Sequence, residues 1–135
     1  MWRNGYWAGS LCSCSLWFPI NTRSLSHAGH AGVVEQACGA VWTLASGNDD
    51  NEIAIAEAGG IERLMAALST HAGHAGVVGA ACGALYNIGR SDRTLQHSIK
   101  DAGAEELLRA AVARSNATAK TKENGRKLLN KLIKL

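Results

Sequence analysis

The segment His27-Ala-Gly-His-Ala-Gly-Val-Val34 returns unchanged as His71-Ala-Gly-His-Ala-Gly-Val-Val78, 44 residues later. The register then continues without a gap, because Ala37-Cys-Gly-Ala40 matches Ala81-Cys-Gly-Ala84. Self-similarity at a fixed period of this length is the signature of helical repeat proteins, in which each unit buries its apolar face against its neighbours. The duplicated segment therefore predicts a repeat architecture for the part of the chain that contains it.

The repeat divides the chain into two parts. Residues 27–135 form the predicted repeat domain, with units at 27–70 and 71–114 and a partial, more polar copy at 115–135. Residues 1–26 do not follow the repeat and contain five of the seven aromatic residues. We expect this leader to be poorly ordered or loosely packed.

Each unit contains the patterns of three helices. In the first unit, apolar and small residues recur at helical spacing over about residues 32–45 and again over about 61–69, with a short helix at about 51–58 between them. The Asn and Asp residues of the turn at 46–50 are suited to cap the short helix. Gly59 and Gly60 predict a sharp corner after it, with a left-handed glycine.

Composition supports an all-helical fold without catalytic motifs. The chain has 135 residues, of which 47% are hydrophobic but only 5% aromatic, so Ala, Leu, Ile and Val must form the interior. Small side chains of this kind suit helix-on-helix packing better than a β-sandwich. No apolar run is long enough for a transmembrane helix, and no phosphate-binding loop or hydrolase motif is present. The acidic residues interpreted as solvated caps or outer-face charges are Asp49, Asp50, Glu57, Glu62, Asp92, Asp101, Glu105 and Glu106.

Two segments resemble a known family. Ile53-Ala-Ile-Ala-Glu-Ala-Gly-Gly-Ile-Glu-Arg-Leu64 resembles the first two helices of an armadillo repeat, and Glu35-Gln-Ala-Cys-Gly-Ala-Val-Trp-Thr-Leu-Ala45 resembles its third helix. The resemblance extends over about residues 27–134. It implies an all-α, right-handed α-solenoid of three-helix repeats, with two full units and a C-terminal capping helix.

The resemblance also implies a binding surface on the third helices, which in this family line a concave groove. Peptide-binding members carry a Trp there, and an Asn four residues later. The Trp position is occupied here by Gly39, Gly83 and Lys127, and the Asn position by Thr43, Asn87 and Lys131. Helical spacing adds Gln36 and Arg90 to the same row. The predicted partner-binding groove is therefore Gln36, Gly39, Thr43, Gly83, Asn87, Arg90, Lys127 and Lys131. We expect Trp42 and Tyr86 to pack between neighbouring repeats instead.

The function predicted from these features is a non-enzymatic protein–protein interaction scaffold that binds a partner peptide or helix along the third helices. The scaffold is expected to form part of a longer repeat array or complex. The alternative is an adaptor that uses the basic amphipathic segment 120–134 to contact an anionic membrane, nucleic acid or a calmodulin-like protein. Residues 116–135 contain six Lys or Arg residues and one acidic residue, whereas residues 1–115 contain eight Lys or Arg residues and ten acidic residues.

Cofactors and metals are not expected. The paired histidines His27, His30, His71 and His74 are interpreted as inherited loop residues, because they lie in the duplicated Ala/Gly-rich segment without carboxylate or Cys company. Cys38 and Cys82 occupy equivalent positions and are interpreted as small buried residues. Four Cys in this arrangement do not form a disulfide framework, which favours a reducing compartment, the cytoplasm or the nucleus.

Overall fold

The computed structural model describes residues 2–3, 6–7, 30–114 and 116–135. At the start of the chain, β1 (Trp2–Arg3) pairs antiparallel with β2 (Tyr6–Trp7), with Trp2 opposite Trp7. The predictions for most of the leader, and for His27, lie outside the described residues.

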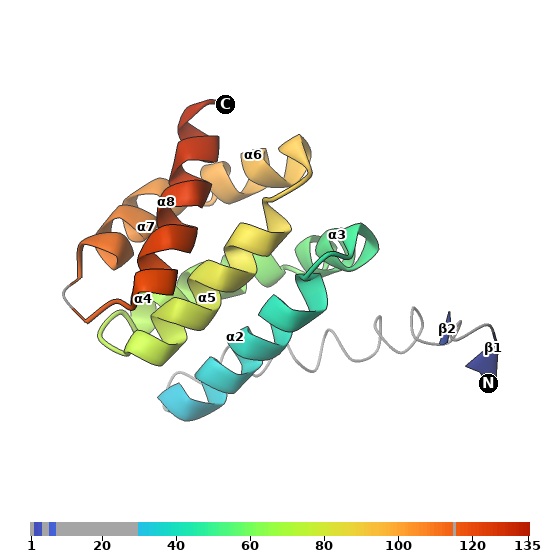
Figure 1. Ribbon diagram of the computed structural model, residues 1–135, viewed down its shortest axis with the longest axis horizontal. Coiled ribbons are helices and arrows are strands. Elements are labelled where there is room, and N and C mark those ends of the chain that lie inside the picture. Colours follow the sequence, from blue (N-terminus) through green and yellow to red (C-terminus); the bar gives the residue numbers. More distant parts are fainter. Residues whose placement is uncertain (1, 4–5, 8–29, 115) are drawn as a thin grey trace.

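Seven helices make up the rest of the described chain (Figure 1). They are α2 (Ala31–Ala45), α3 (Asp49–Glu57), α4 (Gly60–Thr70), α5 (Ala75–Ile88), α6 (Arg93–Asp101), α7 (Ala104–Ala113) and α8 (Ala119–Ile133). The helix pattern predicted from the sequence is confirmed, including the order of two shorter helices followed by a long one, which occurs in α3–α5 and again in α6–α8.

Local sequence sets where the short helices begin and end. The side chain of Asn48 accepts a hydrogen bond from the Asn51 N–H (3.0 Å) and caps α3, and Asp92 caps α6 in the same way. After these helices the chain turns at Gly59 and Gly103, whose φ angles are 75° and 81°. Only glycine adopts this left-handed conformation at little cost, so the predicted corners are confirmed at equivalent positions of both copies.

The long helices form a layer of their own. We call α2, α5 and α8 the third helices; α5 lies between α2 and α8 and packs against both (Figure 1). Helices α4 and α7 pack behind them, against α5 and α8 respectively. The core lies between these layers, and its largest fully buried apolar side chains are Ile55, Ile61, Leu64, Leu85, Ile88, Ile99, Leu108, Leu128 and Leu132.

The basic C-terminal segment is a packed helix. Leu128, Leu129 and Leu132 of α8 are buried in the core, so the apolar side of the amphipathic pattern contacts the other helices. Gly125 allows α8 to approach α7 closely, because a Cβ at this position would lie 2.5 Å from Cγ2 of Val112. The glycine that lowers the helix propensity of the segment is therefore explained by packing.

Candidate interaction surface

The structure separates the predicted groove residues into exposed and buried groups. Gln36, Thr43, Arg90 and Lys127 are exposed, and Gly39 and Lys131 are half-buried. Gly83 and Asn87 are buried between the third helices α2 and α5. The row predicted from helical spacing thus runs partly over the surface and partly through the contact between two repeats.

Two of these residues connect successive third helices. Asn87 Nδ2 donates a hydrogen bond to the backbone oxygen of Trp42 (3.0 Å), which joins α5 to α2. Lys131, which lies 44 residues after Asn87, donates from Nζ to the backbone oxygen of Arg90 (2.5 Å) at the end of α5. Thr43, the equivalent residue of the first unit, donates instead to Gly39 of its own helix (3.0 Å). At two of the three Asn positions, those of Asn87 and Lys131, the side chain therefore joins one third helix to the one before it.

The aromatic residues of the third helices also lie between repeats, as the sequence predicts. The ring of Trp42 covers Gly83 so closely that a Cβ on the glycine would lie 2.6 Å from Cε2 of the indole. The Tyr86 ring centroid is 5.9 Å from Lys131 Nζ on the next helix, within range of a cation–π contact. Glycine at position 83 is thus required by the approach of the Trp42 ring, and α2 can pack tightly on α5.

A second glycine of α5 receives an acidic side chain from α2. The Glu35 carboxylate lies over Gly76, where a Cβ would collide with it, and its Oε2 is 3.8 Å from Nδ1 of His74. Gly76 is in the first turn of α5, where the helix dipole favours negative charge. Helix α2 therefore contacts α5 through a carboxylate and an aromatic ring seven residues apart, each placed over a glycine.

On α2, the face that corresponds to the α2-covered face of α5 is not covered by another helix among the described residues. Gly32 and Gly39 are the counterparts of Gly76 and Gly83, and no described atom lies within 4 Å of a Cβ built on either. Val33 is 46% exposed, whereas its counterpart Val77 is 0% exposed. We call this surface the open face of α2; it consists of Gly32, Val33, Gln36, Gly39, Ala40 and Thr43. It contains three of the predicted groove residues.

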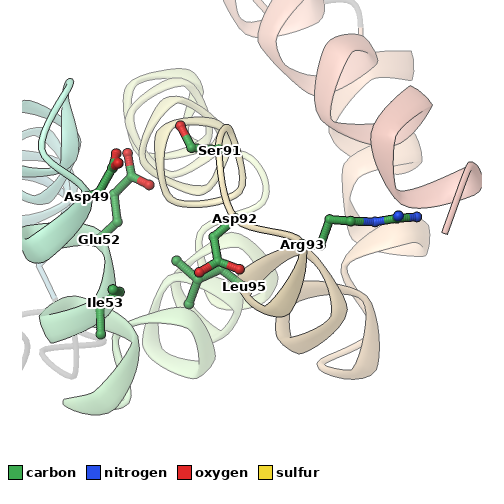
Figure 2. A pocket seen from close by; sticks show the side chains of 7 residues that line it. All are labelled: Asp49, Glu52, Ile53, Ser91, Asp92, Arg93 and Leu95. Atoms are coloured by element: carbon green, nitrogen blue, oxygen red, sulfur yellow. The ribbon is translucent and has the colours of Figure 1, made fainter.

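A pocket of about 380 Å³ lies at another place, between the turns that begin α3 and α6 (Figure 2). It is lined by Asp49, Glu52, Ile53, Ser91, Asp92, Arg93 and Leu95. The side chain of Glu52 is buried, and neither of its carboxylate oxygens has a hydrogen-bond partner among the described residues. Burial raises the pKa of Glu52, and the negative charges of Asp49 and Asp92 raise it further, against the lowering effect of Arg90 and Lys131.

Sequence reasoning did not find Glu52. An acidic residue in the first turn of a short helix resembles the solvated acids beside it. The available signal was the alignment of the two copies, which places Glu52 opposite Gln96. Gln96 is also buried, but its Nε2 donates a hydrogen bond to the Gly89 oxygen (2.8 Å). A carboxylate has no N–H and cannot repeat this bond at position 52.

The described His, Cys, Asp and Glu residues are the candidates for a metal site or a reactive thiol. No group of three or more His, Cys, Asp or Glu in these ranges could hold a metal ion. Cys38 and Cys82 are free and buried, and burial raises the pKa of both thiols to about 12. Thiols with so high a pKa are poor nucleophiles at neutral pH, consistent with their interpretation as packing residues.

The exposed side of α8 is basic, with one ion pair. Lys127 Nζ donates to Glu123 Oε1 (2.5 Å), and this hydrogen bond lowers the pKa of Glu123. Lys120, Arg126 and Lys134 are also exposed on the helix. Among the described residues, no helix is long and apolar enough to cross a membrane.

Comparisons with known proteins agree with the fold. The armadillo/beta-catenin-like repeat family matches residues 48–90, which are the residues of α3, α4 and α5 with their turns. The crystal structure of an engineered protein is similar to 87% of this chain, with a TM-score of 0.77 and 24% sequence identity, and the chain spans 47% of that protein. A search of curated proteins gives no match. The family resemblance drawn from the sequence is thus confirmed, together with an all-helical repeat fold.

Proposed function

We propose that this chain is a non-enzymatic interaction module that binds a helix of a protein partner on the open face of α2. Residues 48–90 match the armadillo/beta-catenin-like repeat family, whose members typically mediate protein interaction. Families of this kind are generally non-enzymatic. The binding mode proposed here combines the predicted residues Gln36, Gly39 and Thr43 with the glycines and apolar side chains around them.

One observation carries this proposal. The chain contains the same face twice, and in the second copy the face is covered by a helix. Gly83 and Asn87 of α5 are buried against α2, whereas their counterparts Gly39 and Thr43 on α2 are half-buried and exposed, respectively. A surface with two glycine positions seven residues apart and a partly exposed valine fits a second helix in the way that α5 fits α2.

The covered copy also indicates what the partner helix carries. Glu35 and Trp42 fill the two glycine positions of α5. The partner helix is therefore expected to present an acidic and an aromatic residue seven positions apart. Such a helix is supplied by another repeat of the same type, in a longer solenoid or in a separate protein. We also propose that the three-helix repeats stack in a right-handed solenoid and that α8 is its C-terminal capping helix. Burial of the apolar side of α8 supports the capping role.

The alternative function through the C-terminal helix is less well supported. Leu128 and Leu132 are fully buried, so a lipid bilayer or a calmodulin-like protein could reach the apolar side of α8 only if the helix left the fold. Its exposed lysines remain available to anionic partners, and such binding weakens steeply as salt increases.

The test is affinity capture with matched variants of the full chain. Thr43→Arg places a long charged side chain on the open face of α2, and Arg109→Glu changes an exposed residue of α7. We expect a protein retained by the wild-type chain to be lost with Thr43→Arg and kept with Arg109→Glu, at low and at physiological salt. Retention by both variants, or loss of the captured protein on raising salt alone, contradicts the proposal.

A further inference from the structure

The acidic pocket, defined by the residues that line it in Figure 2, contains a carboxylate with no described partner. Glu52 is 1% exposed, and both of its oxygens lack a hydrogen bond from any described residue. Buried carboxylates are ordinarily hydrogen-bonded or paired with a positive charge, because an unpaired one loses its hydration without compensation. The carboxylate of Glu52 therefore lacks a hydrogen-bond donor that the described residues do not supply.

The charges around Glu52 favour the same conclusion. Asp49 reaches the pocket from the side of α3, and Asp92 reaches it from the turn before α6. Figure 2 shows Asp49 and Glu52 next to each other, with the Ser91 hydroxyl across the gap, while the side chain of Arg93 extends away from it. Arg93 thus does not neutralise the carboxylates of the pocket. Arg90 and Lys131 lower the pKa of Glu52, but they do not outweigh burial and the acidic neighbours, and neither donates a hydrogen bond to its carboxylate.

The repeat fold does not require a carboxylate at this position. Its counterpart Gln96 is neutral, is also buried, and donates a hydrogen bond to the backbone oxygen of Gly89. A glutamine at position 52 would serve the fold better, since it could donate the same bond. The carboxylate therefore costs stability, and such a cost is expected where a residue serves binding instead of packing.

The pocket also shows which cation it fits. The apolar part of the pocket lining is suited to an organic cation. Ile53 and Leu95 give the pocket apolar walls that suit the methylene groups of a long basic side chain. Two carboxylates near one another match the planar fork of N–H donors of a guanidinium better than the point charge of an ammonium.

We propose that the acidic pocket between the first turns of α3 and α6 binds the arginine side chain of a protein partner. The guanidinium hydrogen-bonds to the carboxylate of Glu52, Asp49 and Asp92 supply further negative charge, and Ile53 and Leu95 contact the aliphatic part of the side chain. This site is separate from the open face of α2, and it does not depend on the partner proposed for that surface.

The test uses N-acetyl-arginine amide as the probe and the full chain labelled with ¹⁵N. The control ligand is N-acetyl-citrulline amide, which has nearly the same shape but no charge. The backbone amide signals of residues 51–53 and 91–93 are followed by NMR during titration. We expect saturable shifts with the arginine compound at millimolar concentrations, the range ordinary for one side chain without the rest of a partner. The citrulline compound is expected to bind at least tenfold more weakly.

Two variants with the same change in charge separate this site from general attraction to acidic surfaces. Glu52→Gln removes the buried carboxylate, and Glu57→Gln removes an exposed one at the other end of α3. We expect Glu52→Gln to lower the affinity for the arginine compound at least tenfold and Glu57→Gln to leave it within twofold, with both variants folded by circular dichroism. Equal binding of citrulline, an equal effect of both variants, or no saturable shift overturns the proposal.

Discussion

Replacing Glu52 by Gln is expected to stabilise the protein at neutral pH. The magnitude follows from the comparison with Gln96, whose Nε2 donates to the Gly89 oxygen over 2.8 Å. A glutamine at position 52 can place the same donor against the oxygen of Ala45, which is the counterpart of Gly89. A new hydrogen bond contributes about 1 kcal/mol, and removing an unsatisfied buried group contributes about 1–3 kcal/mol. Together these contributions are expected to raise the free energy of unfolding by about 2–4 kcal/mol.

The gain depends on pH in a defined direction. Burial, with Asp49 and Asp92, raises the pKa of Glu52 in the folded protein above its value in the unfolded chain. Below the unfolded pKa the side chain is neutral in both states, and the wild-type protein has its full stability. As the pH increases through the folded pKa, the wild-type protein loses this contribution, whereas the glutamine variant has no group to titrate at this position. The advantage of Glu52→Gln is therefore smallest near pH 4 and grows toward neutral pH.

Urea unfolding followed by circular dichroism from pH 4 to pH 8 measures this difference. A gain of 1 kcal/mol corresponds to an increase of about 4 °C in the melting temperature of a domain of this size. The control is Glu57→Gln, which is exposed on the same helix and is expected to change stability by less than about 0.5 kcal/mol at every pH. A Glu52→Gln variant that is less stable than wild type at neutral pH, or an advantage that does not change with pH, would refute the reasoning.

Three further predictions concern the contacts between repeats and the accessibility of the buried thiols. Gly83→Ala places a Cβ 2.6 Å from the Trp42 ring and is expected to destabilise the protein by about 1–3 kcal/mol. The equivalent Gly39→Ala has no described atom within 4 Å of the new Cβ, and its higher helix propensity is expected to stabilise the protein by up to about 1 kcal/mol. Equal melting temperatures of the two variants would contradict this prediction. Asn87→Ala leaves the Trp42 oxygen without its donor and is expected to cost about 1–3 kcal/mol in chemical denaturation, against less than about 0.5 for the exposed Thr43→Ala. The thiols of Cys38 and Cys82, with pKa values of about 12, are expected to react with a disulfide reagent at pH 8 only when denaturant is present, and rapid reaction of both in the folded protein would show that they are accessible.

The helices and their ends could be predicted from the sequence because they depend on neighbours along the chain. Asn48 caps α3 and Gly59 ends the same helical segment through contacts within a few residues. Because the two copies align without a gap, the same helix end could be predicted in the second copy, where Gly103 has the same left-handed conformation.

The surface was harder to predict because it depends on what covers each residue. Gly83 and Gly39 are identical in sequence context, but only Gly83 lies beneath the Trp42 ring. Asn87 occupies the Asn position of the peptide-binding family members, whereas here it donates to a backbone oxygen 45 positions earlier in the chain. Periodicity places such residues on one side of a helix but does not say whether the next helix or solvent lies there.

The central claim is that the open face of α2 receives a partner helix as α5 receives α2, and site-specific photo-crosslinking tests it most directly. A benzophenone amino acid is placed at Gln36 on the open face of α2 and, in a control protein, at Arg109 on the exposed side of α7. We predict that the Gln36 protein crosslinks to a protein that the wild-type chain also captures, that Thr43→Arg abolishes this crosslink, and that the Arg109 protein does not give it. A crosslink of equal yield from both positions, or one that survives Thr43→Arg, would contradict the claim.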